Sequence, residues 1–199
     1  MDNVRSATPG QVRRSPSVPA HWPIRRHVAA AETTPAGPLH SVEVTVPAKT
    51  NLTLHVGPAH EEWGGRHALD TIYCAIGVND VVTATAKTPG SGFSLELSGE
   101  HLGDLASSGN DMRRNHAVLA LFAIARAAGR EPDVALHVDK HIPVGAGLGG
   151  GSADAAATLL AVNTLWGLHW PIERLRDIAA TLGADMPFCL EGGYAHGTG

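Results

Sequence analysis

The sequence predicts an α+β fold in which helices cover one face of a β-sheet. Segments that alternate apolar and polar residues, as half-buried strands do, stand between apolar segments with helical spacing. Strands and helices follow one another in irregular order and without internal repeats, which favours this class. The 199 residues suffice for one domain with a workable core. The longest apolar run, residues 117–125, indicates a buried helix, because a membrane span needs about 20 apolar residues.

The first 40 residues are expected to be a disordered extension, and residues 41–199 the ordered domain. The extension is rich in Pro, Ser, Arg and Ala without periodicity, and it equally suits an Arg-rich transit peptide, a start codon assigned too early or a loose tail. It carries a net charge of +3, whereas the remainder carries −7, which argues against a nucleic-acid surface. No apolar signal segment is visible, and two cysteines make no disulfide framework, so we expect a cytoplasmic protein.

Strands are predicted from residues that alternate between apolar and polar side chains. Residues 42–46 and 52–56 both alternate and are separated by Pro47, which predicts two short strands joined at a bend. Further strand-like segments are residues 70–86, 91–99, 133–139 and 187–199.

Three apolar segments are predicted to be helices. The first spans residues 116–129 and stops at its last residue, a glycine suited to the C′ position. The second runs from Ala153 to Trp166, with Ser152 at the N-cap. The third lies within residues 170–183, where Pro171 suits the first helical position. Its apolar stripe consists of Ile172, Leu175, Ile178, Ala179 and Leu182.

A glycine-rich loop precedes the second helix, with five glycines in residues 145–151. Each glycine costs roughly 0.5–1 kcal/mol of backbone entropy, so this is more glycine than a turn requires. Unpaired N–H groups and the positive end of a helix together make a phosphate site. Gly145, Gly147 and Gly150 match G-x-G-x-x-G, but no strand leads directly into them, and no Gly-Lys-Ser/Thr follows. We therefore predict that the loop binds phosphate, but that it is neither a Rossmann dinucleotide-binding turn nor a P-loop.

The stretch "PVGAGLGGGSADAAA" resembles the phosphate loop of the GHMP kinases, small-molecule kinases without a Walker motif. Three more segments occur in the family's order: "VPAKTNLTLHV" early in the chain, "VDKHIPV" leading into the loop and "LGADMPF" after it. The resemblance therefore covers about residues 42–199. It implies a GHMP kinase N-terminal domain with helices on one face of a mixed sheet, a fold also similar to a domain of ribosomal proteins. It implies ATP and Mg²⁺ as cofactors and a small-molecule alcohol as substrate. "PAKTNL" and "GADMP" favour the erythritol-derivative branch of isoprenoid biosynthesis over mevalonate or homoserine kinases.

Site residues follow from this resemblance. Asp185 is the implied catalytic acid–base residue, and Lys49 the cation beside it and the transferred phosphoryl group. Asn51, on the same strand face as Lys49, and His67, aligned with a histidine that reads cytosine, are the implied substrate contacts. The implied nucleotide contacts are Asn115, Lys140, Pro143, Val144, Gly145, Ala146, Gly147, Leu148, Gly149, Gly150, Gly151, Ser152 and Ala153.

The residues alone leave simpler roles open. Asp185 beside a proline equally suits a turn, and Lys49 an exposed bend. Asn115 equally suits a helix cap and Lys140 the surface, while Asp154 suits the positive end of a helix.

A dedicated metal site is not predicted. His137 and His141 are four residues apart on a strand and loop, a setting that does not bring such positions together as a helix would. The sequence offers Ser152 alone as a candidate magnesium ligand near the loop.

Two departures from the family pattern affect function. Arg66 stands where an aromatic ring is expected to stack on the cytosine, although a guanidinium can also stack on a ring. The sequence ends at Gly199, so we expect the C-terminal GHMP domain to be absent and the chain alone to have little or no kinase activity. A catalytically inactive nucleotide-binding fragment is therefore the main alternative, and an RNA-binding protein is disfavoured by the acidic body.

Overall fold

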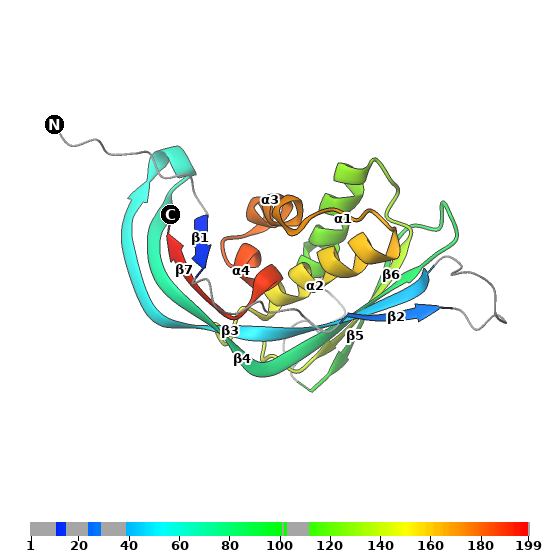
Figure 1. Ribbon diagram of the computed structural model, residues 1–199, viewed down its shortest axis with the longest axis horizontal. Helices are drawn as coiled ribbons and strands as arrows, with labels where there is room; N and C mark the ends of the chain where they lie inside the picture. The colour runs from blue at the N-terminus through cyan, green and yellow to red at the C-terminus, as the bar shows by residue number, and fades with distance from the viewer. Residues whose placement is uncertain (1–10, 15–23, 29–38, 101, 103–111, 199) are drawn as a thin grey trace.

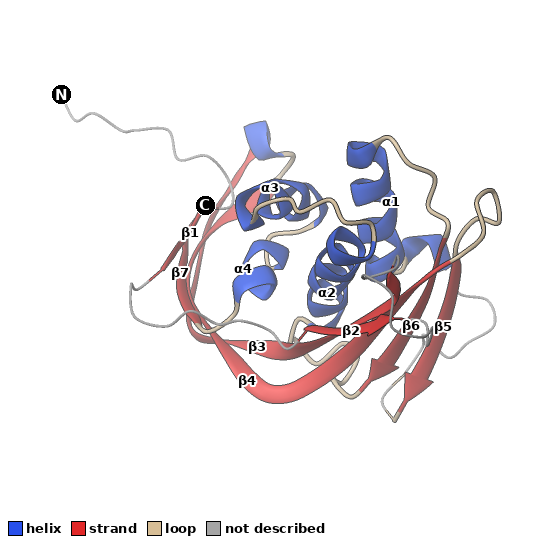
Figure 2. Ribbon diagram, turned by 45° about the vertical axis from the view of Figure 1, so that its right-hand side comes forward, coloured by secondary structure: helices blue, strands red, loops and turns tan. Residues whose placement is uncertain are grey.

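The computed structural model describes residues 11–14, 24–28, 39–100, 102 and 112–198. Seven strands form one sheet, and the helices lie on its concave face (Figures 1 and 2). The long strands β3 (Leu39–His60) and β4 (Arg66–Ala86) pair along their length. Strand β6 (Val134–Lys140) pairs antiparallel with β4 and parallel with β5 (Ser94–Gly99). The sheet is therefore mixed, and the predicted α+β class is confirmed.

The two short strands predicted on either side of Pro47 are one continuous strand, β3. Its pairing with β4 shifts register between Pro47 and Ala48 and again between Asn51 and Thr53. A bulge lets a proline stay within a strand, because the hydrogen-bond ladder is already interrupted there. The prediction of a break was therefore wrong. The alternation was correct in the first part of β3, where Val42, Val44 and Val46 are all fully buried beneath the helices. It did not predict burial in the second part, because Leu52, Leu54 and Val56, at or after the second shift in register, are all exposed.

Two segments of the expected N-terminal extension are strands. β1 (Gln11–Arg14) pairs with β7 (Tyr194–Thr198), and β2 (Ile24–Val28) pairs with β3, both antiparallel. The expectation of disorder was wrong for these residues, because an edge strand joins a sheet through its main chain and needs little apolar periodicity of its own. The remainder of the first 38 residues lies outside the described part of the chain.

Helices α1 (His116–Ala128), α2 (Gly150–Leu165) and α3 (Ile172–Leu182) occupy the predicted segments. Asn115 is the N-cap of α1, and its side chain accepts a hydrogen bond from the N–H of Ala117 at 2.9 Å. Helix α2 is the central helix and packs against β3, β4, α1 and α4, since its alanines permit close approach. None of the described helices is long and apolar enough to cross a bilayer.

One boundary near the glycine loop differs from prediction. Helix α2 begins at Gly150 with Gly149 as its N-cap, three residues before the predicted cap at Ser152. An ordinary residue at 150 would place its Cβ 3.1 Å from the Lys140 ammonium, so close packing explains a glycine inside the first turn.

Residues 187–191, predicted as part of a strand, belong to the short helix α4 (Met186–Glu191). Its apolar side chains are buried, and a short apolar run does not distinguish a buried helix from a buried strand.

Candidate active site

Lys49 and Asp185 meet although they lie far apart in the sequence. Lys49 comes from the middle of β3, and Asp185 is the residue at which α4 begins. The Lys49 Nζ lies 3.2 Å from Asp185 Oδ2, and the hydroxyl of Tyr73 donates to Asp185 Oδ1 at 2.9 Å. The Tyr73 ring stacks on Phe188 at 4.9 Å between centroids, which fixes the hydroxyl toward the carboxylate. Burial, reinforced by Asp185, raises the pKa of Tyr73, so this hydroxyl remains a donor.

Asn51 extends the same polar row along the helix-facing side of the sheet. Its Oδ1 accepts from Lys49 Nζ at 2.9 Å, and its Nδ2 lies 2.6 Å from Thr71 Oγ1. The Thr71 hydroxyl in turn donates to the carbonyl of Thr53 at 2.6 Å. Lys49 therefore has two oxygen partners, from Asn51 and Asp185, and its orientation is set by both.

The glycine loop is attached directly to Lys49. The backbone N–H of Lys49 donates to the carbonyl of Leu148 at 2.9 Å. Gly149 has φ +69°, and a Cβ there would lie 2.8 Å from Lys49 Cγ. Only glycine adopts this left-handed conformation without strain and also leaves room for the lysine side chain. The loop and the Lys49–Asp185 pair are consequently parts of one site.

A cavity of about 250 Å³ lies over the loop. Arg114, Asn115 and His116, at the start of α1, form part of its wall. The other lining residues are Lys140, Ile142, Pro143, Val144, Gly145, Ala146, Gly147, Leu148, Gly149, Gly150, Gly151 and Asp154.

The first turn of α2 presents the loop's N–H groups to this cavity. The N–H of Ala153 already donates to the carbonyl of Gly149 at 2.9 Å, so the N–H groups without an intrahelical partner precede it. Ser152 and Ala153, predicted as nucleotide contacts, are not among the residues that line the cavity. All the other predicted nucleotide contacts do line it.

Lys140 lies beneath the loop rather than within reach of solvent. Its Nζ donates to Asp154 Oδ2 at 2.8 Å and to Asp80 Oδ2, and all three side chains are buried. Burial works against the charge on Lys140, but the two carboxylates outweigh it and raise its pKa. Lys140, which was predicted to contact the nucleotide, therefore already has two carboxylate partners.

His67 lies on β4, six residues before Tyr73 and on the same face by strand alternation. Six strand residues correspond to roughly 20 Å along the chain. Its Nδ1 lies 2.9 Å from the carbonyl of Gly57; since a carbonyl only accepts, Nδ1 carries the proton and Nε2 is left as an acceptor. The side chain of its neighbour Arg66 lies outside what the structure describes.

Sequence reasoning missed several residues of this site, among them Tyr73, Asp80, Arg114 and His116. Tyr73 shares a strand face with Thr71, and this alternation was the available signal. Asp80 contacts residues 60 to 62 positions away, which no local pattern reveals.

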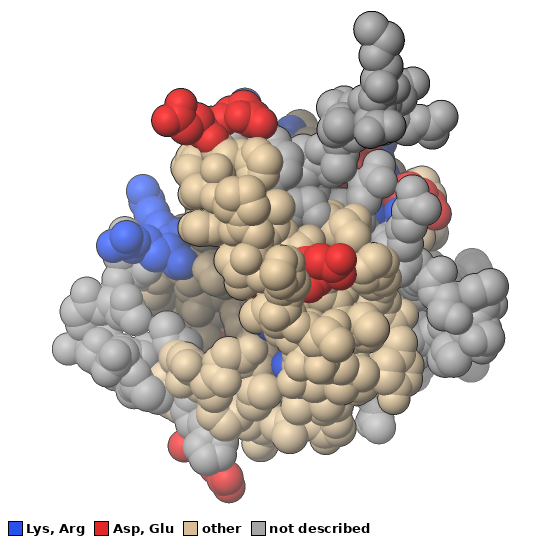
Figure 3. Space-filling view, turned by 90° about the vertical axis from the view of Figure 1, so that its left-hand side faces the viewer, with Lys and Arg blue, Asp and Glu red and all other residues tan. Residues whose placement is uncertain are grey.

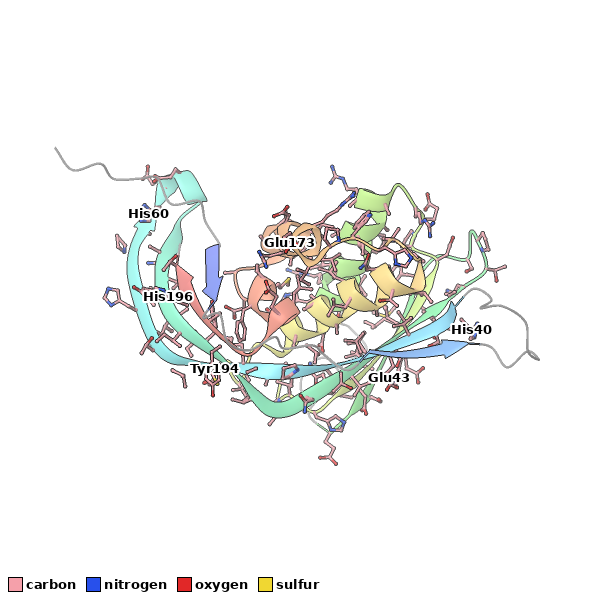
Figure 4. The ribbon with its side chains drawn as sticks, viewed as in Figure 1. His40, Glu43, His60, Glu173, Tyr194 and His196 are labelled. Atoms are coloured by element: carbon pink, nitrogen blue, oxygen red, sulfur yellow. The ribbon has the colours of Figure 1, made fainter. Side chains whose placement is uncertain are left out.

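The described residues contain no group of three or more His, Cys, Asp or Glu side chains arranged to hold a metal ion. The outer face of the sheet, from which Glu43 and Tyr194 project away from the helices, lies on the opposite side from this site (Figure 4). The arrangement can bind an anion against backbone N–H groups and place a carboxylate and an ammonium beside it.

The fold and the glycine loop match one family of protein domains. Residues 115–193 match the family model of the GHMP kinases N terminal domain. This match and the solved structures described below support the predicted fold, that of a GHMP kinase N-terminal domain.

Two relatives with similar sequences carry the same name. A 4-diphosphocytidyl-2-C-methyl-D-erythritol kinase of Bifidobacterium adolescentis is 76% identical over 161 residues, which are 81% of this chain and 52% of the relative. A protein of the same name from Mycobacterium tuberculosis is 46% identical over 162 residues, which are 81% of this chain and 48% of the relative. The chain thus spans about half the length of the curated relatives it matches.

Solved structures agree with this fold. A 4-(cytidine 5'-diphospho)-2C-methyl-D-erythritol kinase superposes with a TM-score of 0.60 at 36% identity, covering 79% of this chain and 52% of that one. A homoserine kinase from Cytophaga hutchinsonii superposes with a TM-score of 0.59 at 18% identity, covering 84% of this chain and 50% of that one. The second likeness concerns the fold alone.

Proposed function

We propose that this chain is the nucleotide-binding part of an ATP-dependent kinase that phosphorylates a hydroxyl of 4-diphosphocytidyl-2-C-methyl-D-erythritol, in cytoplasmic isoprenoid biosynthesis. The names of the relatives support the substrate. One observation carries the reaction: Lys49 touches Asp185 with its side chain and the glycine loop with its backbone.

In this proposal Asp185 accepts the proton of the substrate hydroxyl as that oxygen attacks the γ-phosphorus of ATP. The bond between the γ-phosphorus and the bridging oxygen breaks, and ADP leaves with the electron pair. Tyr73 donates to Oδ1 and Lys49 lies beside Oδ2, so the carboxylate is held in one orientation. The lysine ammonium also balances negative charge on the transferred group.

The N–H groups at the start of α2 and the glycines before them hold the phosphates. Mg²⁺ in such sites is bound mostly through phosphate oxygens with one or two protein oxygens, so the sparse set of side chains here fits it. It would neutralise phosphate charge. Ser152, the candidate ligand that the sequence offers, lies in the first turn of α2 but does not line the cavity.

An elongated substrate suits the face shared by Asn51 and His67. Strands β3 and β4 curve round on the side of the sheet that the helices cover, and the end of β3 at His60 lies beyond the curve (Figure 4). His67, on this curved part, offers Nε2 as an acceptor for an amino group such as that of cytosine.

A second candidate is a nucleotide-binding module that does not transfer phosphate. It depends on the glycine loop and the cavity over it, and needs no contribution from Asp185. An RNA-binding role has less support: among the described side chains on the face shown in Figure 3, Lys and Arg form a small group and no continuous band.

Calorimetric titration with ATP and a phosphoryl-transfer assay with the proposed substrate test both candidates. We expect ATP to bind, the chain alone to transfer phosphate at a low rate, and Asp185→Ala to abolish that transfer while leaving binding nearly unchanged. ATP binding with no transfer by either protein would favour the second candidate, and no ATP binding would refute both.

A further inference from the structure

Asp80, Lys140 and Asp154 form a buried cluster beneath the glycine loop. Asp80, on β4, is fully buried, and its Oδ1 accepts from the backbone N–H groups of His141 and Ile142 at 2.6 and 2.8 Å. Those two residues begin the segment that leads into the loop. One side chain from a distant strand therefore fixes the backbone where the loop starts.

The same carboxylate is connected to the point where the loop ends. Its Oδ2 accepts from Lys140 Nζ, which also donates to Asp154 Oδ2 at 2.8 Å, in the early turns of α2. The two ends of the loop are thus joined through three side chains from β4, β6 and α2. Gly150 leaves room for the ammonium between them.

Stability alone is a poor explanation for this cluster. A buried ion pair is often no more stabilising than apolar residues of the same volume, because both charges lose their hydration. Here two carboxylates face one ammonium, and Asp154 Oδ1 has no hydrogen-bond partner among the described residues. An excess negative charge beneath a phosphate site also opposes binding. The contacts of the cluster with both ends of the loop indicate a geometric role instead.

We infer that Asp80 is a positioning residue for nucleotide phosphates: with Lys140 and Asp154 it sets the separation of the two ends of the glycine loop. The loop's N–H groups then point into the cavity before ATP arrives, which lowers the cost of ordering them on binding. This inference rests on the proposed nucleotide site.

Asp80→Asn tests the inference, because an amide cannot serve all three donors. If its oxygen faces the two backbone N–H groups, its NH₂ faces the Lys140 ammonium, and the link is broken there. We expect the dissociation constant for ATP to rise about tenfold or more, measured by calorimetry well below the melting temperature of each protein. Asp70→Asn, on the same strand with its own partner His196 at 2.8 Å, is the matched control and should bind ATP normally.

The outcomes separate this inference from the proposed function. A less stable Asp80→Asn that binds ATP as tightly as the original chain would make Asp80 merely structural and overturn the inference, leaving the kinase proposal intact. Failure of the original chain to bind either ATP or inorganic triphosphate would overturn both.

If Asp80→Asn does not fold, hydrogen exchange on the original chain decides. We expect the amides of His141 and Ile142 to be protected without ATP, and those of residues 145–151 only with it. Equal and rapid exchange of both sets without ATP would refute the anchor.

Discussion

Two lysine–aspartate contacts flank the same loop, and they differ in their access to water. The Lys49–Asp185 pair leaves 29% of the Asp185 side chain exposed, whereas the cluster of Lys140, Asp80 and Asp154 is almost fully sealed. The open pair can receive a substrate proton. The sealed cluster cannot reach one, and it acts on the backbone instead.

Both groups consist of lysine and aspartate, but only the exposed pair can take part in the reaction, whereas the buried cluster can only support the site. A partly exposed ion pair contributes little to stability, while removing one partner of a buried group leaves an uncompensated charge. Substitutions in the open pair should therefore alter the reaction, and those in the sealed cluster should alter folding and loop geometry.

Asp185→Asn should have the largest effect on phosphoryl transfer. The amide retains an acceptor for Tyr73 but cannot take the substrate proton, so we expect the transfer rate to fall about 10²–10⁴-fold. The melting temperature and ATP affinity should change little, as measured by thermal unfolding and calorimetry. Asp177→Asn, on the exposed side of α3, is the control and should behave as the original chain. Undiminished transfer by Asp185→Asn would remove Asp185 from the mechanism.

For stability, the larger effect is expected from the lysine of the sealed cluster and the smaller from the lysine of the open pair. Lys140→Met leaves two buried carboxylates without their cation and should cost about 3–5 kcal/mol of unfolding free energy. Lys49→Met should cost roughly 1 kcal/mol or less, because Asp185 can be hydrated. Urea denaturation of both variants measures the difference, and equal losses would contradict the division between the open pair and the sealed cluster.

The sequence predicted the open pair better than the sealed cluster, for a physical reason. Lys49, the glycine loop and Asp185 each lie in a short contiguous motif whose spacing carries the resemblance. Lys140 was also found this way, but Asp80, its partner 60 residues earlier, has no local signature. Tyr73 meets Asp185 across 112 residues and was missed for the same reason.

The fold follows the same rule. Periodicity located α1 and α3 and the alternation in β3, because these depend on near neighbours in the sequence. The edge strands β1 and β2, the early start of α2 and the helical state of residues 187–191 depend on what packs against them. Tertiary contacts decided those four features.

Gly149→Ala sharpens the connection between the loop and the open pair. The φ of +69° costs an alanine about 1–2 kcal/mol, and its Cβ would also displace the Lys49 side chain. Gly167→Ala is the matched control, since Gly167 has φ +60° and a Cβ there would make only an ordinary contact, 3.9 Å from His169 Nε2. We expect similar losses of stability in both variants by urea denaturation, but a loss of phosphoryl transfer only in Gly149→Ala. Equal transfer by both would show that Lys49 tolerates the shift.

The smallest expected effect is a pH dependence of stability that originates in the sealed cluster. Burial raises the pKa of Asp154 to about 7, with Asp80 adding to the rise and Lys140 opposing it. An aspartate whose pKa is higher in the folded chain binds a proton on folding, so it favours the folded state at low pH and loses that contribution as pH rises through roughly 4 to 7.

Asp154→Asn mimics the protonated carboxyl and still offers Lys140 an oxygen. Its melting temperature should therefore exceed that of the original chain at pH 8, and the difference should shrink toward pH 5. Thermal unfolding at both pH values measures this, with Asp70→Asn as an exposed control that should show no such trend. A difference that grows toward pH 5 would mean that the carboxylate at 154 is stabilised by Lys140 more than it is penalised by burial. The sealed cluster would then resemble the open pair in its electrostatics, and burial alone would not distinguish the two.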